Sequence, residues 1–372
     1  MNVLFLSNLT GNLWAGPNHS VPAQVLAQSK VDNVMWLNLN HNRRAEWSIG
    51  GVDCKTLDDY PTGRLRDLPA PFNHPDVVMV EEAYCYPFSK IIRDIQKENI
   101  PYVIVPRSTL TNQAQRHKSL KKVIGNLVYF RRMFANAVAI QYLTEQEKMD
   151  SADGDWNRSC FVIPNGIYMP EEMKFTESDE TSEKKIVYIG RMEIYQKGLD
   201  FLLEAVKYHA ESMRRDNIKL YIYGPDRENT RIKLETFISE NALADVVFLG
   251  DSLLGQEKER VLRESNAFIM TSRFEGLPMG MLEALAYGLP CFATRGTNLI
   301  EEINREDAGW TAETDVNDII KVYGEMIADL PDTSIIVHKQ NNAKRLAQTY
   351  SWDYQAVRLH DELLNILKER ES

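Results

Sequence analysis

Short apolar runs rich in β-branched residues alternate along this chain with longer segments whose apolar residues recur at helical spacing. This alternation is typical of a parallel sheet whose strands are joined by crossover helices. The runs that we expect to form strands are Val3–Leu6, Val34–Leu37, Val77–Val80, Tyr102–Val105, Ala139–Tyr142, Phe161–Ile163, Ile186–Ile189, Leu220–Tyr223, Val246–Leu249, Ala267–Met270 and Cys291–Ala293.

The strand candidates fall into two series, separated by a segment with little apolar content. The first series ends at the turn signal Ile163-Pro164-Asn165-Gly166, and the acidic stretch from Glu171 to Lys184, which we interpret as a linker, follows it. We therefore predict an α/β fold of two Rossmann-like, doubly wound domains, residues 1–167 and 168–350, with a final helical segment, 351–372. In two such sheets the carboxyl ends of the strands line a shared crevice, where ligands bind.

Length, charge and cysteine content narrow the function classes. A chain of 372 residues suits two α/β domains, and no apolar run approaches the roughly 20 residues of a transmembrane helix. The N-terminus lacks the basic stretch and cleavage site of a signal peptide. Four scattered cysteines indicate neither a zinc site nor a disulfide framework, which favours a reducing, cytoplasmic location. The net charge of -10 argues against a nucleic-acid partner.

The most specific chemical signal lies between Ser272 and Pro290. After a predicted buried strand, Gly276-Leu277-Pro278-Met279 opens a helix, whose free backbone N–H groups and dipole suit an anion. Glu275 precedes this helix and Glu283 lies more than one turn inside it. The two carboxylates therefore address separate points, which fits one group near a sugar and the other near a ribose. Taken alone, each of the two is equally an ordinary solvated acid.

With this Glu-x7-Glu spacing across a Gly-Leu-Pro helix start, the chain resembles the retaining glycosyltransferases of the GT-B architecture, glycosyltransferase family four (glycosyl transferases group one). The resemblance implies two Rossmann-like domains facing each other across a cleft, an N-terminal acceptor domain and a C-terminal nucleotide-sugar donor domain. It also implies a last helix that returns from about Trp352 to the N-terminal domain. It also implies that Glu275 is catalytic and lies at the transferred sugar, that Glu283 binds the donor ribose, and that the backbone of Gly276–Met279 meets the sugar and the diphosphate.

A second segment agrees with this resemblance. A strand candidate ends in Gly190-Arg191, and Lys197-Gly198 follows before a predicted helix. In the family, this pattern opens the second domain, which implies that Gly190, Arg191 and Lys197 bind the donor. An Arg presents a planar fork to phosphate and a Lys a compact charge, so both can neutralise a leaving nucleoside diphosphate. The alternative is a loop with two surface cations.

The sequence predicts no metal and no cofactor. No Asp-x-Asp pair follows a strand where Mg²⁺ or Mn²⁺ would be held through substrate phosphates. The run Asp150-Ser-Ala-Asp153-Gly-Asp155 lacks the full ligand pattern of a calcium loop, and we interpret it as a solvated turn. The expected ligand is the substrate itself, a nucleotide-sugar such as a UDP- or GDP-sugar.

Two positions in the first half depart from the family's pattern. Gly16-Pro17 stands in the loop Asn8–Asn18, where the family usually has a Gly-Gly pair that approaches the donor diphosphate or the acceptor. Arg107 stands after a strand, where related sequences often carry a His that touches the transferred sugar. An Arg cannot act as a base at neutral pH, but it can hydrogen-bond a sugar or hold an anion. We therefore predict Gly16 as a donor-binding residue and Arg107 as a residue of the catalytic site.

The segment from Arg107 to Arg132 contains seven Lys and Arg residues and no Asp or Glu, together with an apolar stripe that includes Leu127, Val128 and Phe130. This pattern indicates a basic amphipathic helix at an anionic membrane surface, which suits a polyprenyl-linked acceptor. The enzyme would then be peripherally associated with the inner face of the plasma membrane. The alternative is a helix packed on its own sheet with a solvated basic face.

The predicted function is retaining, metal-independent transfer of a sugar from a nucleotide-sugar donor to a saccharide or lipid-linked acceptor, in bacterial surface polysaccharide or glycoconjugate synthesis. The family expectation is front-face displacement, in which the leaving phosphate helps to take the acceptor proton. One alternative is a sugar-nucleotide epimerase or a phosphorylase on the same fold, which would form epimer or sugar phosphate without an acceptor. Another is a non-catalytic sugar-nucleotide-binding protein, which a transferase activity that collapses in Glu275→Ala would exclude.

Overall fold

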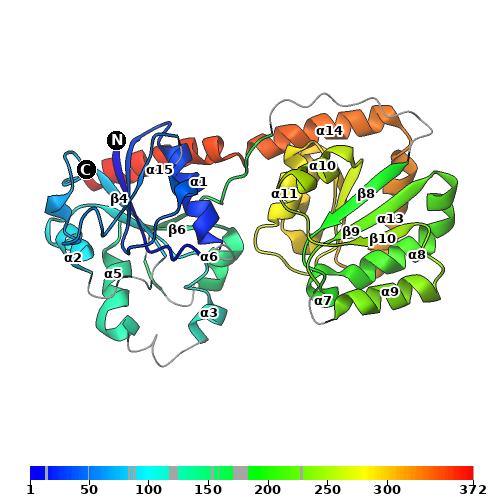
Figure 1. The fold of residues 1–372 in the computed structure, drawn as a ribbon, viewed down its shortest axis with the longest axis horizontal. Helices are drawn as coiled ribbons and strands as arrows, with labels where there is room; N and C mark the ends of the chain where they lie inside the picture. Colours follow the sequence, from blue (N-terminus) through cyan, green and yellow to red (C-terminus); the bar gives the residue numbers. More distant parts are fainter. Residues whose placement is uncertain are drawn as a thin grey trace. The chain divides into compact units, whose positions relative to one another are not determined.

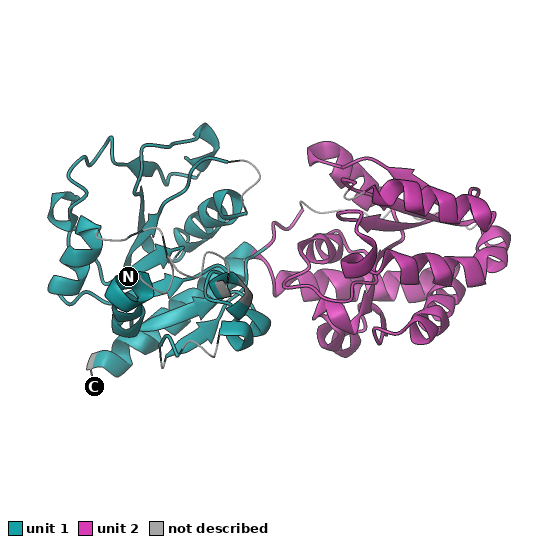
Figure 2. Cartoon of the chain, turned by 90° about the horizontal axis from the view of Figure 1, so that it is seen from below, with its two compact units in different colours: residues 1–166, 352–372 teal, residues 167–351 magenta. Residues whose placement is uncertain are grey.

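The computed structural model divides the chain into two compact units, Met1–Gly166 with Trp352–Ser372, and Ile167–Ser351 (Figures 1 and 2). The predicted boundaries after residues 167 and 350 each lie one residue from these divisions. The predicted linker falls mostly on residues 171–182, which lie outside the described residues. The structure describes residues 1–12, 16–48, 50–82, 84, 86, 89–116, 125–151, 155–157, 159–170, 183–226 and 229–371.

The first unit contains a parallel sheet with helices around it. Its strand order, β3-β2-β1-β4-β5-β6-β7, reverses between β1 and β4, as in a doubly wound fold. The described strands are β1 (Asn2–Ser7), β2 (Asn33–Asn38), β3 (Cys54–Thr56), β4 (Val77–Glu81), β5 (Tyr102–Val105), β6 (Ala139–Tyr142) and β7 (Cys160–Val162). The helical elements are α1 (Pro17–Gln28), η1 (Ala45–Trp47), η2 (Leu65–Asp67), α2 (Lys90–Lys97), α3 (Asn112–Arg116), the π-helical turn η4 (Asn126–Phe130), α5 (Arg131–Asn136), α6 (Glu145–Ser151) and α15 (Trp352–Glu371).

The second unit repeats this design with the strand order β10-β9-β8-β11-β12-β13, which reverses between β8 and β11. Its strands are β8 (Lys184–Ile189), β9 (Ile218–Tyr223), β10 (Val247–Gly250), β11 (Ala267–Met270), β12 (Cys291–Thr294) and β13 (Gly309–Ala312). Its helices are α7 (Ile194–Lys197), α8 (Leu199–Arg215), α9 (Thr230–Glu240), α10 (Gly255–Glu264), α11 (Met279–Ala286), η6 (Arg295–Thr297), α12 (Ile300–Glu306), α13 (Val316–Asp329) and α14 (Thr333–Gln348). Ligands of doubly wound sheets bind where the order reverses, so the ends of β8 and β11 are the place to seek a site.

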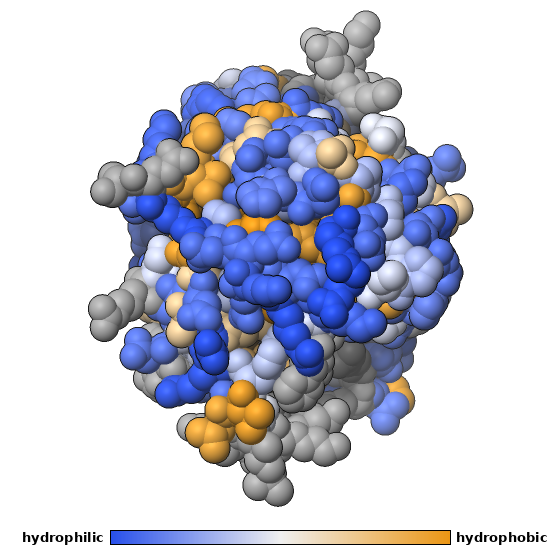
Figure 3. All heavy atoms as spheres, turned by 90° about the vertical axis from the view of Figure 1, so that its left-hand side faces the viewer, coloured by the Kyte–Doolittle hydropathy of each residue, from blue (hydrophilic) through white to orange (hydrophobic). Residues whose placement is uncertain are grey.

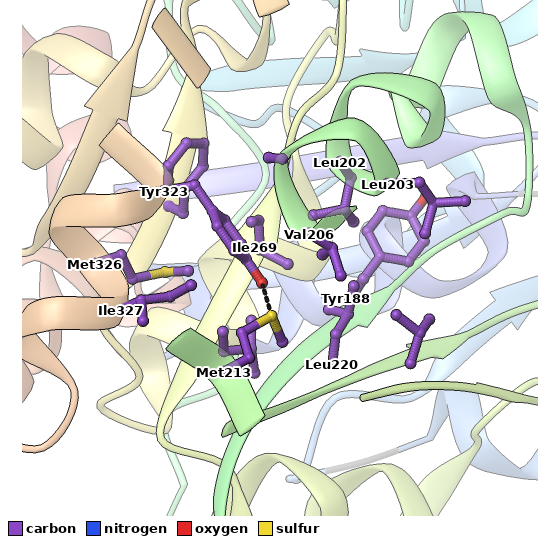
Figure 4. Packing of buried hydrophobic residues seen from close by; sticks show 14 of the residues in the cluster. Tyr188, Leu202, Leu203, Val206, Met213, Leu220, Ile269, Tyr323, Met326 and Ile327 are labelled. Carbon is purple, nitrogen blue, oxygen red and sulfur yellow. Dashed lines mark hydrogen bonds between the residues drawn. The ribbon is translucent and has the colours of Figure 1, made fainter. Parts of the chain in front are cut away.

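Apolar side chains on both faces of each sheet explain why the strand candidates read as continuous apolar runs. All residues of β5 and β11 are buried, for example. In the second unit, Tyr188 of β8 belongs to the same core cluster as Leu202 and Val206 of α8, and Tyr323 of α13 donates a hydrogen bond from its hydroxyl to Met213 Sδ at 3.5 Å (Figure 4).

The last helix, α15, packs on the first unit. Trp352 and Ala356 form a small apolar cluster with Ala23 and Ala27 of α1. The fold class, with two Rossmann-like sheets and a last helix that returns to the first of them, is therefore confirmed. The strands β3 and β13 were not predicted. None of the described helices is both long enough and apolar enough to cross a lipid bilayer.

Candidate functional site

An ion pair joins the two motifs that follow β8 and β11. Lys197 Nζ donates to Glu275 Oε1 at 2.6 Å, and the two side chains are only 10% and 9% exposed. Ser272 Oγ donates to the same oxygen, also at 2.6 Å. The other carboxylate oxygen, Glu275 Oε2, has no hydrogen-bond partner within the described part of the chain. It is therefore the oxygen that can accept a hydrogen bond from a ligand.

The segments that carry Lys197 and Glu275 are joined by hydrogen bonds. The Arg273 N–H donates to the Gln196 carbonyl at 2.8 Å, and Thr271 Oγ1 donates to the Gly198 carbonyl at 2.8 Å. Gly198 has a φ of +62° and lies so close to β11 that an added Cβ would overlap the Thr271 carbonyl oxygen. A glycine is therefore required at this crossing.

Gly198→Ala is expected to destabilise the second unit by about 2–4 kcal/mol, because the left-handed conformation and the overlap with Thr271 both add cost. Gly255→Ala is the matched control, since Gly255 also has a positive φ, +51°, but no heavy atom lies within 4 Å of its added Cβ. We expect the control to lose only about 1 kcal/mol. Equal shifts of the thermal unfolding midpoint in both variants would contradict the close-packing role.

The start of α11 presents backbone donors beside this ion pair. The N–H groups of Gly276, Leu277 and Gly280 have no hydrogen-bond partner among the residues that the structure describes. Asn298 Nδ2 holds the turn from behind by donating to the Glu275 carbonyl at 2.6 Å. No side chain of the described residues caps the helix at Pro278, where it begins, so its N-terminal groups and dipole are available to an anion.

Two further predicted residues complete the neighbourhood of the turn. Leu277 and Met279, which flank Pro278, are half-buried and pack against the apolar cluster beneath α11. The backbone of this segment, rather than its side chains, is therefore the part that can meet a diphosphate.

Arg191 is linked to the turn indirectly. Its Nη2 donates to Gln196 Oε1 at 3.2 Å, and Gln196 Nε2 in turn donates to the Phe274 carbonyl at 3.4 Å. Its Nη1 lies 3.4 Å from Glu193 Oε2. Gly190 packs tightly behind it, with its N–H donating to the Tyr223 carbonyl at 3.0 Å. The structure thus places Lys197 and Glu275 in contact, and Arg191 one side chain away from the turn.

Glu283 has a partner that the sequence did not indicate. It forms an ion pair with Lys258 of α10, and its side chain is 36% exposed. Its predicted contact with a donor ribose stays a prediction.

Replacing Glu283 by glutamine is expected to raise the Kd for a nucleoside diphosphate about tenfold, because a hydrogen bond to a charged group contributes roughly 1.5 kcal/mol or more. Inorganic pyrophosphate has no ribose, so its Kd should stay unchanged. Lys258→Met is the matched control, since it removes the ion pair and keeps the carboxylate. Isothermal titration calorimetry of the wild type and the two variants gives the Kd of each ligand. If Glu283→Gln raises the Kd of the nucleoside diphosphate and of pyrophosphate equally, a ribose contact is excluded.

Arg107 is held within the first unit by a buried network. Its Nε lies 2.8 Å from Glu81 Oε2, and these side chains are 5% and 0% exposed. Its other nitrogens donate to Ser20 Oγ at 2.9 Å, Gln24 Oε1 at 3.1 Å and Asn165 Oδ1 at 3.3 Å. Burial raises the pKa of the Glu81 carboxyl, and Arg107 opposes that shift. The structure therefore shows Arg107 as an anchor between β4 and α1, and its contact with a substrate stays a prediction.

Gly16 directly precedes α1 with an ordinary helical φ of -48°, and no heavy atom of the described residues lies within 4 Å of an added Cβ. Residues 13–15 of the same loop lie outside the described residues. Its predicted contact with the donor stays a prediction.

The predicted basic helix is described only in part, as α3, η4 and α5, because residues 117–124 with Lys118, Lys121 and Lys122 lie outside the described residues. On η4, Leu127 and Val128 are 83% and 65% exposed. The face of the molecule shown in Figure 3 is mostly hydrophilic, with small, separate hydrophobic areas.

Among the described residues, which do not include Asp153, no group of three or more His, Cys, Asp or Glu side chains is placed to hold a metal ion.

Sequence reasoning missed the residues that support the predicted ones. Ser272 lies three residues before Glu275, and this short spacing within one turn was the only sign in the sequence that the two side chains could form a hydrogen bond. Asn298, Lys258 and Glu81 reach the site residues from 23 to 26 positions away in the chain, and nothing local in the sequence pointed to these pairs.

Comparison with known proteins finds similarity over part of the second unit. Residues 183–329 match the family model of glycosyl transferases group 1. An uncharacterised glycosyltransferase of Methanocaldococcus jannaschii is 30% identical over 186 residues, which are 47% of this chain and 43% of that protein. The lipopolysaccharide 1,6-galactosyltransferase of Escherichia coli K12 is 31% identical over 139 residues, which are 35% of this chain and 36% of that protein. The chain thus matches less than half of the length of either relative.

Solved structures extend the likeness in fold to the whole chain. HepE of Anabaena in complex with UDP superposes with a TM-score of 0.66 at 12% identity, covering 98% of this chain and all of that one. A sucrose-phosphate synthase from Thermosynechococcus elongatus superposes with a TM-score of 0.64 at 14% identity, covering 99% of this chain and all of that one. These likenesses show that the chain has the GT-B fold.

Proposed function

We propose that this chain, whose residues 183–329 belong to the glycosyl transferases group 1 family, transfers a sugar from a nucleotide-sugar donor to a saccharide or lipid-linked acceptor. The observation that carries the proposal is the contact of Lys197 with Glu275 at the start of α11, beside backbone N–H groups that have no partner within the described residues. A cation, free amides and a carboxylate oxygen there match the parts of a nucleotide-sugar, which are a diphosphate and a hydroxyl-rich ring.

Each group has a distinct task in this proposal. The amides of Gly276 and Leu277 and the ammonium of Lys197 stabilise the charge that develops on the leaving diphosphate. Arg191 adds a second cation after its contact with Gln196 is released. Glu275 Oε2 accepts a hydrogen bond from a sugar hydroxyl, while Lys197 and Ser272 fix Oε1. This arrangement orients the sugar for attack by the acceptor.

We further propose that the transfer retains the anomeric configuration and needs no metal. The cations at the turn support the second point, since they can take the role of a metal on the diphosphate. Proton NMR of the first-formed product reports its anomeric configuration, and an inverted product would exclude retention. Activity that survives excess EDTA is expected, and activity that returns only when Mg²⁺ or Mn²⁺ is added would exclude metal independence.

A thermal-shift series with UDP, GDP and ADP, each with and without an attached sugar, tests the donor site. A ligand that binds only the folded protein raises its melting temperature with occupancy, so one nucleotide series should stand out. Failure of every nucleoside diphosphate at millimolar concentration would exclude the proposal. Incubating the preferred nucleotide-sugar without acceptor separates the alternatives, because an epimerase or phosphorylase forms epimer or sugar phosphate under those conditions.

A lipid-linked acceptor at an anionic membrane is the finer part of the proposal. The exposed side chains of Leu127 and Val128, next to Arg131 and Arg132, support it, since apolar and basic groups together bind such surfaces. Sedimentation with vesicles that contain anionic lipid should carry the protein down, and Leu127→Asp with Val128→Asp should abolish this. Equal sedimentation with neutral vesicles would exclude an electrostatic contribution.

A further inference from the structure

Two aromatic rings are exposed on the segments that carry the Lys197–Glu275 pair. Tyr195 on α7 is 69% exposed and Phe274, directly before Glu275, is 54% exposed. Their ring centroids lie 6.5 Å apart with an interplanar angle of 60°. Single exposed apolar side chains are common, but two contacting rings beside a candidate site form the kind of exposed apolar surface that binds ligands.

The rings are held in place by a rigid support. Arg273 forms two hydrogen bonds with the Asp200 carboxylate, at 2.8 and 2.7 Å, and its guanidinium carbon lies 4.9 Å from the centroid of Tyr195. Arg273 Nη1 also donates to the Tyr195 carbonyl at 2.9 Å, and Gln196 Nε2 donates to the Phe274 carbonyl at 3.4 Å. Both backbones are therefore fixed before any ligand arrives, which lowers the entropic cost of binding.

The size and surroundings of the rings favour a small ligand with an apolar face and a polar edge. A specific protein partner needs about 1,200 Å² or more of buried surface, far more than two rings provide. Polar side chains lie close by in the same segments, since Gln196 directly follows Tyr195 and Glu275 directly follows Phe274. A pyranose ring fits this pattern, because its faces carry C–H groups and its edge carries hydroxyls.

We propose that Tyr195 and Phe274 form a stacking subsite for a pyranose ring of the acceptor saccharide, beside the donor sugar. The proposal rests on the proposed function. In that proposal the donor sugar meets Glu275, whose side chain is only 9% exposed, whereas the rings of Tyr195 and Phe274 are 69% and 54% exposed. A second saccharide, and not the donor, is therefore the ligand that reaches the rings.

Saturation-transfer NMR tests the subsite, with the methyl pyranosides of glucose, galactose, mannose and N-acetylglucosamine as probes. The protein is first saturated with the nucleoside diphosphate that gives the largest thermal shift. At least one pyranoside should receive saturation on its ring C–H protons, and Tyr195→Ala with Phe274→Ala should reduce it about fivefold or more, as expected for loss of an aromatic anchor. Tyr195→Phe should keep the signal, because the ring and not the hydroxyl makes the contact.

Tyr208→Ala is the matched control, since Tyr208 is 73% exposed on α8 of the same unit and contacts His209. It should leave the signal unchanged. Equal saturation in the wild type and the double variant, or no saturation of any pyranoside by the wild type, would overturn the subsite. The Kd of the nucleoside diphosphate, measured on the same samples, separates the two hypotheses. If the wild type does not bind any nucleoside diphosphate, the proposed function is wrong. If it binds the nucleotide and no pyranoside, only the subsite is wrong.

Discussion

Lys197→Met is expected to lower kcat/KM for sugar transfer about 10²–10³-fold, the usual effect of removing one group that stabilises charge in a transition state. The variant loses the cation that pairs with Glu275 just before α11, and it leaves the Glu275 carboxylate with Ser272 and without its charged partner. Most of the loss should lie in kcat, because the charge on the diphosphate grows as the sugar leaves. Steady-state kinetics with the preferred nucleotide-sugar gives both constants.

Lys339→Met is the matched control for this experiment. Lys339 is also only 10% exposed and also pairs with an acid, Asp307, but it lies on α14 and contacts the Trp310 ring. We expect this variant to lose stability and keep its kcat. If both lysine variants lose activity to the same degree, the effect of Lys197 arises from folding and not from the leaving group.

Arg107→Met is expected to lower the free energy of unfolding by about 3–5 kcal/mol, since it leaves the Glu81 carboxylate buried without its charged partner. Glu81 Oε1 has no hydrogen-bond partner within the described residues, so the variant removes the hydrogen bond that Arg107 donates to the other oxygen, Oε2. Differential scanning calorimetry measures the change through the melting temperature of the first unit.

A double variant, Glu81→Leu with Arg107→Met, separates the structural role of Arg107 from its predicted role at the substrate. We expect the double variant to be more stable than Arg107→Met alone, because an apolar pair replaces an unpaired charge. If it is no more stable, the buried pair is not the source of the loss. If the double variant regains stability but stays inactive, Arg107 also contacts the substrate. If it regains both stability and activity, the role of Arg107 is structural.

The arrangement of strands was predictable because buried parallel strands leave a strong local signal. The candidates at Tyr102–Val105, Ala139–Tyr142 and Ala267–Met270 coincide with β5, β6 and β11, and the other predicted strands differ by no more than two residues at either end. The edge strand β3, of three residues, and β13, which begins with a glycine, carry too few apolar residues for such a signal. Their pairing is decided by neighbours that are distant in the sequence.

The candidate site was predictable only as far as the motifs reach. Two motifs pointed to the site: Glu275 just before a helix start, and the Gly-Arg and Lys-Gly pairs. The structure brings these residues to one end of the sheet, where Lys197 contacts Glu275. The spacing did not reveal that Glu283 faces Lys258, or that Arg107 turns toward Glu81. Such partners come from other elements, and only the packed structure selects them.

The return of α15 has a consequence for how the molecule is made. Leu359 and Leu363 are fully or almost fully buried in the same cluster as Val3 and Phe5 of β1, so the first unit lacks part of its core until residues near the end of the chain are available. Residues 167–351, by contrast, form an uninterrupted stretch. During synthesis on the ribosome, the second unit can therefore complete its core before the first. The first unit keeps part of its core exposed until α15 has been synthesised.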